Sequence, residues 1–271
     1  MTRRTCTGRR APEDPSGGAL GRGACLRRRI KAGLPVVGSA LTIAEPFTTE
    51  VMGRAGFDFL MIDSEHSPIT ASELQTMLIA LQTSASAVLV RVTENRHHPI
   101  MQALDLGADG VVVPHVDTAQ ECAAAVDSAK YPPDGHRGFG PRRAKRLVAD
   151  SSYERTANDV LVIPMIESVA AVENIDQIGV TPGVDGVFVG PSDLAVSLKS
   201  GDADVVDAQA RAVFAACRRH GIAPGIIPNT NGDTAAWIRA GAQMVTIGSD
   251  LRFLDAGIAA ALEERARALN G

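Results

Sequence analysis

The stretch "LGADGVVVPHVD", residues 106–117, shows the pattern that decides the fold. Its Gly-Ala pair closes a helix-length amphipathic stretch, because glycine accepts the left-handed conformation in which many helices end. The valine run after it is typical of a buried strand. Proline, histidine and aspartate then follow the valines. The stretch therefore predicts a helix that leads into a strand with polar residues at its end.

The same unit recurs along the chain from Leu26 onward. Three further strands follow a helix that ends in glycine, in "GRAGFDFL", "RRHGIAPG" and "RAGAQMV". Helical candidates with apolar residues at three- and four-residue spacing span residues 71–84, 118–131 and 207–221. The predicted strands are residues 35–41, 58–63, 87–92, 110–116, 161–167, 184–190, 223–229 and 244–249.

Alternation of strands and helices requires crossover connections and hence a parallel sheet. Eight such units, without a G-x-G-x-x-G fingerprint after the first strand, favour an α/β fold that is a single (β/α)8 TIM barrel over a doubly wound sheet. We expect this barrel domain to span residues 26–271. Residues 1–25 contain paired arginines but no continuous apolar run, so we expect a disordered N-terminal tail rather than a secretion signal.

The composition narrows the classes of partner. The 271-residue chain has a formal net charge of −4 and no basic stripe, which argues against a nucleic-acid or membrane surface. No apolar run approaches the roughly 18 residues of a membrane span. The four cysteines are widely spaced and form no CxxC pair, so they indicate neither a zinc knuckle nor a disulfide framework. We therefore expect a cytoplasmic protein whose ligands are small molecules.

One predicted connection, residues 129–160, is unusually long. Loops of this length in compact domains are usually functional or disordered. This one carries Arg137, Arg142 and Arg143 among prolines and glycines. We expect it to be a lid, a subunit contact or an anion site.

Two carboxylates at strand ends are candidates for metal binding, since a TIM barrel carries its active site at the C-terminal ends of its strands. Glu167 and Asp193 follow successive strands, which would place them side by side at the barrel mouth. Such a pair suits Mg²⁺ or Mn²⁺, with water and substrate as the remaining ligands. Both acids also stand where a helix could begin, so helix capping is the alternative. Their spacing alone leaves both interpretations open.

The stretch "MIDSEH", residues 61–66, ends the second strand with two acids and a histidine. A carboxylate that is hydrogen-bonded to an imidazole fixes the tautomer and raises the basicity, as a general base requires. We therefore expect Asp63 to orient His66 as a catalytic base. Metal ligation and a polar loop without chemistry are the alternatives. Glu65 would support a metal's water shell or brace the loop, and His115 carries only a weak expectation.

Arg91 lies inside an apolar strand, where an unpaired guanidinium is costly. It either pairs with a structural acid or meets an anionic substrate at the strand end, and we favour the second interpretation. The four lysines, in contrast, all lie outside the predicted strands. A barrel enzyme that works through a Schiff base needs a desolvated lysine at its core. A metal is therefore the expected electron sink.

Taken together, these stretches resemble the HpcH/HpaI type of metal-dependent (class II) pyruvate aldolases, a branch of the aldolase and citrate lyase superfamily. The resemblance runs from about Leu26 to Leu262. It rests on "GFDFLMIDSEHSP", "VLVRV", "GADGVVVPHVDT", "YPPDGHRGFGPRRA", "MIESVAAVENID" and "GVDGVFVGPSDLAVSL". It implies reversible cleavage of 4-hydroxy-2-oxo acids to pyruvate and an aldehyde, through an enolate that the metal stabilises.

The resemblance also implies how the metal and the keto acid bind. Glu167 and Asp193 would hold the divalent ion, Mg²⁺ or Mn²⁺, with Co²⁺ as a further candidate. Pyruvate would chelate that ion, and Arg91 would hold the keto oxygen and stabilise the enolate charge.

Further roles follow from the same resemblance. His66, oriented by Asp63, would move the proton. The carboxylate of pyruvate would be cradled by the backbone around Gly190, Pro191 and Ser192. The resemblance also implies a homo-oligomer, a hexamer built as a trimer of dimers in which partners exchange the last helix.

Two departures limit what the resemblance implies. Met165 stands where some members have Gln, so substrate preference is not carried over. The "FGPRRA" segment resembles a subgroup feature that names no acceptor aldehyde. Oxaloacetate decarboxylation, or a related carbon–carbon lyase reaction through the same enolate, is the main alternative. A lyase for CoA thioesters is less favoured because no nucleotide-binding segment is evident, and a non-catalytic keto-acid-binding barrel is the non-enzymatic alternative.

Overall fold

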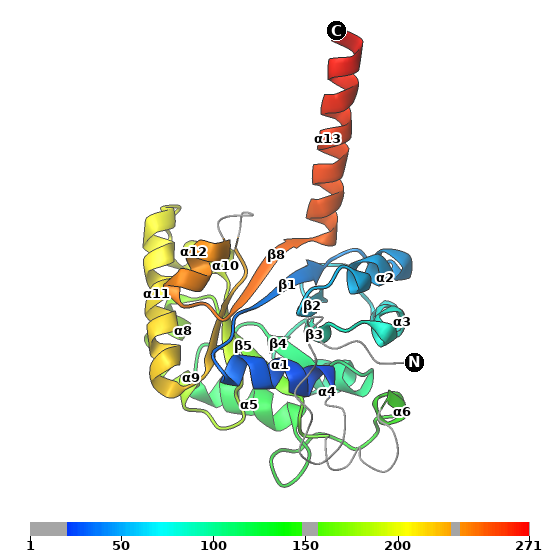
Figure 1. Cartoon of the computed structure of the whole chain (residues 1–271). Helices are drawn as coiled ribbons and strands as arrows, with labels where there is room; N and C mark the ends of the chain where they lie inside the picture. Colours follow the sequence, from blue (N-terminus) through cyan, green and yellow to red (C-terminus); the bar gives the residue numbers. More distant parts are fainter. Residues whose placement is uncertain (1–20, 148–156, 229–233, 271) are drawn as a thin grey trace.

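The computed structural model describes residues 21–147, 157–228 and 234–270 and confirms the predicted barrel. All eight strands are parallel, each is hydrogen-bonded to the next, and β8 closes the barrel against β1 (Figure 1). The strands are β1 Val36–Leu41, β2 Phe59–Asp63, β3 Ala87–Arg91, β4 Gly110–Val113, β5 Leu161–Ile166, β6 Gly186–Val189, β7 Ala223–Ile226 and β8 Met244–Ser249. Each predicted strand contains one of these, and the predicted strand 223–229 reaches a residue outside the described ranges.

Helices connect the strands around the outside of the barrel. Sequence signals place several of their starts: Thr70 and Thr118 each form a capping box with a glutamate three positions later. The helices are α1 Arg22–Lys31, α2 Pro46–Arg54, α3 Ala71–Ala80, the 3₁₀ helix η1 Leu81–Thr83, α4 His97–Asp105, α5 Ala119–Ala129, α6 Ala144–Leu147, α8 Val169–Glu173, α9 Ile175–Gly179, α10 Pro191–Leu198, α11 Ala203–His220, α12 Thr234–Ala240 and α13 Asp250–Asn270.

The strands separate two apolar cores. Alternate residues of β2 belong to different clusters: Leu60 and Ile62 pack with helix residues, whereas Phe59 and Met61 pack with inward residues of other strands. Inside the barrel the rings of Phe59 and Phe188 lie 5.9 Å apart. The inside is thus filled by side chains, as is usual for this fold, and leaves only the strand ends for a site.

Helix α1 closes the N-terminal end of the barrel, where it contributes buried Leu26 and Ile30 to the inner core. This corrects the predicted tail, because residues 22–25 are helical rather than disordered. Arg22 donates to Leu81 O at 2.7 Å and pairs with Asp109 at 3.2 Å, which ties down the start of the helix. Residues 1–20 of that predicted tail lie outside the described residues.

Three aspartates that each precede a strand anchor α1. Asp58, Asp109 and Asp185 each accept a backbone N–H from the preceding strand of the barrel. They also pair with three arginines of α1, in the pairs Arg29–Asp58, Arg22–Asp109 and Arg27–Asp185. The "FDF", "ADG" and "VDG" motifs are therefore structural, and they keep the bottom of the barrel shut.

The described parts of the long connection between α5 and β5, residues 130–147 and 157–160, do not form the expected lid. The connection joins the end of a helix to the start of a strand, so it belongs to the end of the barrel opposite the mouth (Figure 1). Arg137 is buried, pairs with Asp105 at 2.5 Å and stacks on Tyr131. Arg143 donates to the carbonyls of Leu78 and Leu106 at the ends of α3 and α4.

Two expectations for this connection remain predictions, a subunit contact and an anion site. Exposed Arg142 contributes to a hollow of about 440 Å³ on the outside of the connection. Residues 148–156 of the connection lie outside the described residues.

Helix α13 leaves the barrel at the end of β8 and projects away from it (Figure 1). Its first turns touch β1 and β8, and Phe253 stacks on Phe57 with ring centroids 6.3 Å apart. Beyond these turns, exposed apolar side chains recur along the helix at Leu254, Ile258 and Leu262. Among the described helices, α13 included, none is long and apolar enough to cross a membrane.

Candidate active site

Two pairs of neighbouring strands, β2–β3 and β5–β6, bring the predicted site residues to the C-terminal end of the barrel. Asp63 is the last residue of β2 and Arg91 the last of β3, and the two are paired in register. Glu167 directly follows β5, and Gly190 directly follows β6 as the residue before α10. Since parallel strands end at one rim, these side chains share the mouth of the barrel.

Arg91 is held by a bidentate pair with Asp63. Arg91 Nε donates to Asp63 Oδ1 at 2.8 Å, and Nη2 donates to Oδ2 at 2.6 Å. Both side chains are almost fully buried. The remaining nitrogen, Nη1, lies 3.2 Å from Glu65 Oε2. The structural acid that Arg91 required is therefore present, while Nη1 stays directed at the other polar groups of the mouth.

Asp63 contacts His66 through the backbone rather than through the ring. Asp63 Oδ1 accepts the backbone N–H groups of Glu65 at 3.1 Å and of His66 at 3.3 Å. The imidazole of His66 is 59% exposed, and its Nε2 lies 3.7 Å from Glu65 Oε2. We expected the Asp63 carboxylate to orient this ring; instead it fixes the loop from which the ring projects, because its oxygens are occupied by Arg91 and these amides.

Glu65 occupies the centre of the cluster. Its buried carboxylate faces Arg91 Nη1 through Oε2 and lies 3.2 Å from His115 Nε2 through Oε1. Oε2 is fully buried and has no hydrogen bond of good geometry within the described part of the chain. The sequence left two roles open for Glu65, supporting a metal's water shell or bracing the loop, and the structure places it between the arginine and two histidines.

Glu167 is the most enclosed acid of the mouth. Its Oε1 accepts the backbone N–H of His115 at 2.8 Å. Its Oε2 faces Gly190, where a Cβ atom would lie only 3.0 Å from that oxygen and 3.1 Å from Met165 Cε. Glycine at 190 therefore leaves the space into which Oε2 points.

Asp193 lies in the first turn of α10, close enough to Glu167 for their charges to interact. The helix begins at Pro191 after Gly190, and no side chain caps it. The first N–H groups of a helix have no acceptor within the helix, so such an end favours an anionic group. The sequence-predicted cradle of Gly190, Pro191 and Ser192 thus coincides with a helix N-terminus beside the two acids.

Burial and neighbouring charges shift the pKa values of three groups at the mouth, Glu167, Glu65 and Arg91. Burial raises the pKa of Glu167, the charges of Glu65 and Asp193 add to this, and the His115 hydrogen bond opposes it. Burial also raises the pKa of Glu65, against the neighbouring charges of Arg91 and the histidines. Burial alone would lower the pKa of Arg91, but its hydrogen bonds to Asp63 and the surrounding acids raise it. Burial therefore disfavours the ionised forms of Glu167 and Glu65, while the arginine stays charged.

This donor set fits a divalent metal that keeps several other ligands. Within residues 21–147, 157–228 and 234–270, no group of three or more His, Cys, Asp or Glu side chains is arranged to hold a metal ion. Two carboxylates, Glu167 and Asp193, are available on adjacent elements, and a cation would relieve the cost of keeping both ionised. Mg²⁺ typically takes one or two carboxylates and completes its shell with water and substrate oxygens.

Met165 forms part of the floor of this site. It is fully buried on β5, and its Sδ lies 3.9 Å from Arg91 Nη1. Its Cε is also close to the space beside Gly190. The residue that departs from some members of the resembled family therefore lies directly between Arg91 and the predicted carboxylate cradle.

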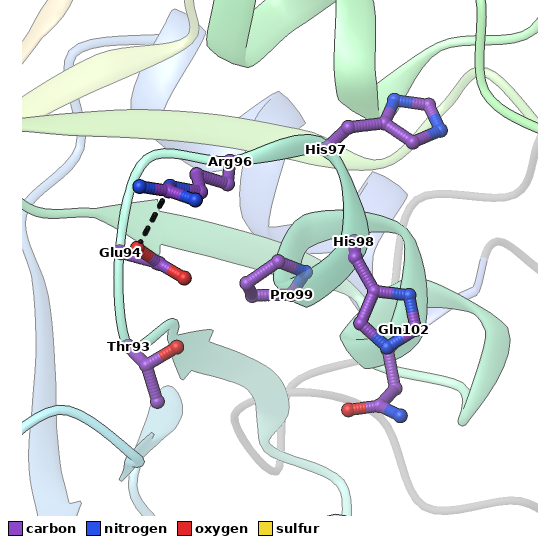
Figure 2. A pocket seen from close by; sticks show the side chains of 7 residues that line it. All are labelled: Thr93, Glu94, Arg96, His97, His98, Pro99 and Gln102. Atoms are coloured by element: carbon purple, nitrogen blue, oxygen red, sulfur yellow. Dashed lines mark ion pairs between the residues drawn. The ribbon is translucent and has the colours of Figure 1, made fainter.

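A separate hollow of about 640 Å³ lies on the loop between β3 and α4 (Figure 2). Arg96 and Glu94 form an ion pair of 3.0 Å along it, and the rings of His97 and His98 point in different directions. None of the predicted site residues lines it.

His115 is the residue that the sequence expectation undervalued. It stands at the mouth with its ring between Glu65 and Glu167, and its backbone has a φ of 54°. The available signal was its position immediately after Pro114 at the end of a valine strand, in the same place as the other strand-end residues.

The family model described as HpcH/HpaI aldolase/citrate lyase matches residues 41–255. Among curated proteins, the 5-keto-4-deoxy-D-glucarate aldolase of Salmonella paratyphi A (strain ATCC 9150 / SARB42) is 42% identical over 220 residues, which cover 79% of this chain and 86% of that protein. The counterpart from Salmonella arizonae is 41% identical over 226 residues, covering 82% of this chain and 88% of that protein.

Among solved structures, an HpcH/HpaI aldolase/citrate lyase family protein from Burkholderia cenocepacia J2315 has a TM-score of 0.84 and 32% identity, and it covers 89% of this chain and 98% of that one. The prediction of an aldolase-type carbon–carbon lyase is confirmed by these relatives. With most of its length matched by the family model, the chain belongs to the HpcH/HpaI aldolase/citrate lyase family.

Proposed function

We propose that this aldolase cleaves a 4-hydroxy-2-oxo dicarboxylate of the kind named for its curated relatives, 5-keto-4-deoxy-D-glucarate. Those relatives are 41–42% identical to it over about four fifths of the chain. With the carboxylate next to the keto group as carbon 1, the bond between carbons 3 and 4 breaks. The products are pyruvate and 2-hydroxy-3-oxopropanoate, a three-carbon aldehyde acid.

The reaction requires neither an oxidant nor a reductant. The hydroxyl group on carbon 4 loses its proton and becomes a carbonyl, and the electrons of the broken bond pass to the enolate of pyruvate. A proton added to carbon 3 then gives the methyl group. A divalent ion, when bound, takes up negative charge on the keto oxygen as a Lewis acid. The protein supplies the proton transfers and the orientation of the substrate.

Five residues at the mouth have a proposed task. Glu167 and Asp193 hold the divalent ion, Mg²⁺ or Mn²⁺. Arg91 donates to the keto oxygen and stabilises the charge that develops there. His66 accepts the hydroxyl proton, because its exposed imidazole is free to meet a substrate, and Asp63 fixes both Arg91 and the loop that carries His66.

The α10 end of the mouth suits the carboxylate of the keto acid. Its backbone follows Gly190 and contains Pro191 and Ser192, and a helix N-terminus favours an anion. The single observation that most supports the proposal is the buried Arg91–Asp63 pair, whose arginine lies close enough to Glu167 for their charges to interact, while none of the eight described strands contains a lysine.

The test measures pyruvate release from 5-keto-4-deoxy-D-glucarate with lactate dehydrogenase and NADH, in the presence of Mg²⁺ or Mn²⁺. We expect turnover that EDTA abolishes and that added metal restores. His66→Ala should lower kcat by about 10²- to 10⁴-fold, the usual contribution of a general base. Turnover that persists in both EDTA and His66→Ala would contradict the proposed roles.

A second measurement separates the aldolase from its alternatives. In D₂O with metal, the methyl protons of pyruvate should exchange for deuterium, and the exchange should be lost in His66→Ala and in Glu167→Ala. Exchange without cleavage of the dicarboxylate, combined with release of CO₂ from oxaloacetate, would indicate the decarboxylase alternative. Pyruvate binding without exchange would indicate a keto-acid-binding barrel.

We also propose that the protein is a homo-oligomer, a hexamer built as a trimer of dimers, in which α13 packs against a partner. The support is that, among the described elements, α13 touches β1 and β8 and then projects away from the barrel (Figure 1), while Leu254, Ile258 and Leu262 stay exposed on one stripe. A surface helix normally buries such a stripe. A second copy of the chain would provide the missing cover.

The cytoplasm remains the proposed location. The described cysteines, Cys25, Cys122 and Cys217, are free and buried. Free thiols are typical of a reducing compartment.

A further inference from the structure

We propose that His115 is a positioning residue that holds two acids of the mouth at once, Glu167 through its backbone and Glu65 through its imidazole. This inference rests on the proposed function, because it concerns the acid that would bind the metal. It assigns a role to a residue outside the set of metal, proton-transfer and carboxylate-binding residues.

The backbone of His115 supplies the first contact. Its φ of 54° lies in the left-handed region, and within the described ranges the only other non-glycine residue with a positive φ is Lys199. Only a few per cent of non-glycine residues adopt this conformation, and asparagine, aspartate and histidine are enriched among them. Here the conformation directs the N–H of His115 to Glu167 Oε1 at 2.8 Å.

This contact divides the two oxygens of Glu167 between two tasks. Oε1 is engaged by the His115 amide, whereas Oε2 points to the space beside Gly190. Asp193 enters the mouth from the helix that follows Gly190. The amide of His115 therefore selects Oε2 as the oxygen presented to a cation shared with Asp193.

The imidazole of His115 supplies the second contact. Its Nε2 lies 3.2 Å from Glu65 Oε1, and its Nδ1 lies 3.6 Å from Glu167 Oε1. Although the ring is 70% exposed, it is thus bracketed by two buried carboxylates. The other oxygen of Glu65 faces Arg91 Nη1. By engaging Oε1, the ring keeps Glu65 from turning toward the metal side of the mouth and keeps Oε2 against Arg91.

The two contacts predict different effects for different substitutions. His115→Asn and His115→Gly remove the ring but favour the left-handed backbone, so the amide contact to Glu167 should survive. His115→Val removes the ring and opposes that backbone, because β-branched residues are disfavoured at positive φ. The valine variant should therefore lose both contacts, and the other two should lose only the one to Glu65.

Metal affinity tests the backbone contact. Free Mn²⁺ is titrated into metal-free protein and followed by electron paramagnetic resonance, with no substrate present. We expect the Mn²⁺ affinity of His115→Asn and His115→Gly to lie within about threefold of the wild-type affinity. His115→Val should bind Mn²⁺ roughly tenfold more weakly, the factor that corresponds to the cost of a left-handed residue. Equal Mn²⁺ affinity in the Val and Asn variants would overturn the backbone role. If thermal unfolding shows that the Val variant does not fold, His115→Ala takes its place with the same expectation.

Substrate kinetics test the imidazole contact. We expect His115→Asn to raise the KM for the dicarboxylate about tenfold at saturating Mn²⁺, because Glu65 is released from its place against Arg91. Glu65→Gln in the same chain should cancel most of that increase. A KM for His115→Asn equal to that of wild type would overturn the imidazole role.

The two measurements also separate this inference from the proposed function. Wild-type protein that binds Mn²⁺ but releases no pyruvate would refute the aldolase substrate, while the order of Mn²⁺ affinities would still decide the backbone role of His115. Wild-type protein that cleaves the dicarboxylate, together with variants that match it in both Mn²⁺ affinity and KM, would refute the role of His115 alone.

Discussion

Arg91 and Asp63 end neighbouring strands in register and share two hydrogen bonds, of 2.8 Å and 2.6 Å. Asp63 reaches His66 only through the backbone N–H of that residue. Asp63 and His66, the acid–base pair expected from the sequence, are therefore connected through the loop backbone. The Asp63 carboxylate binds mainly the Arg91 guanidinium. This arrangement separates the stability of the site from its proton chemistry.

We expect Asp63→Asn to lower the free energy of unfolding by about 3 kcal/mol, because it leaves the buried Arg91 charge without its partner. His66→Ala should change it by less than about 0.5 kcal/mol, since exposed side chains away from buried networks contribute little. Urea denaturation monitored by circular dichroism measures both. Equal stabilities of the two variants would contradict this division.

A double-mutant cycle locates the catalytic effect of Asp63. If Asp63 acts through Arg91, Asp63→Asn should reduce kcat nearly as much in a His66→Ala background as in the wild type, and the two effects should add. If it acts through the imidazole, its effect should largely disappear in that background. We expect the additive result, measured as pyruvate release.

The fold could be predicted from the sequence because it depends on local patterns. The valine run of 111–113 identifies a strand, and Gly107 before it identifies a helix end, without knowledge of any partner. The order of strand ends around a barrel is then fixed by chain order, which brought Glu167 and the residues around Gly190 to one rim. Chain order did not indicate which side chains pair across that rim.

Pairing was harder to predict because it depends on register and backbone conformation. Asp63 meets Arg91 since both residues end their strands at the same level, and His115 meets Glu167 since its φ is positive. The first residues of α1 were predicted to belong to a tail because the acids that pair with Arg22 and Arg27 lie 87 and 158 positions further along the chain. Such distant partners leave no trace in a local sequence pattern.

The metal should stabilise the folded protein through Glu167 and Asp193. A ligand that binds only the folded state at about 100 times its Kd adds about 2.7 kcal/mol, so Mn²⁺ should raise the Tm of the wild type by several degrees. Glu167→Gln and Asp193→Asn should each abolish this rise. Glu65→Gln is the matched control from the same mouth and should retain it, and a Tm rise in Glu167→Gln would argue against the proposed ligand.

Met165→Gln should move stability and substrate binding in opposite directions. An amide in this fully buried position would leave part of its hydrogen-bonding capacity unsatisfied, which costs about 1–3 kcal/mol. The same amide would replace the weak sulfur contact to Arg91 and offer a hydrogen bond beside Gly190, so we expect a KM for pyruvate lowered several-fold. Met165→Leu is the control and should leave both quantities nearly unchanged. An unaltered KM in Met165→Gln would place the substrate elsewhere.

Lys130 should make stability depend on pH above neutrality. Its buried Nζ donates to the carbonyls of Asn158 and Val160, both at 2.6 Å. Burial, aided by the charge of Arg27, lowers the pKa of Lys130 from 10.5 to about 8. Between these values the unfolded chain binds the proton that the folded chain has released, so stability rises with pH across this window. The full effect amounts to about 3 kcal/mol.

The comparison with Lys130→Met isolates this effect. Burial raises the pKa of Cys122 to about 11 and of Cys217 to about 12, which lowers stability at high pH, but it does so in both chains. We therefore expect the stability of wild type relative to Lys130→Met to increase by about 3 kcal/mol between pH 7.5 and 10.5. Urea unfolding at both pH values measures it, and parallel pH curves would show that Lys130 keeps its proton in the fold.

Charged residues on the apolar stripe of α13 should break the assembly without unfolding the barrel. Ile258 and Leu262 are exposed on the part of the helix that projects away from the barrel (Figure 1), so an aspartate at either position removes no buried contact with the described part of the same chain. It would, however, bury a charge wherever a partner covers the stripe, which is costly. We expect Ile258→Asp and Leu262→Asp to give smaller particles by light scattering, with unchanged circular dichroism. Glu263→Gln, one position along the same exposed helix, should keep the wild-type mass. A particle mass unaffected by both aspartates would mean that α13 is not the contact between subunits.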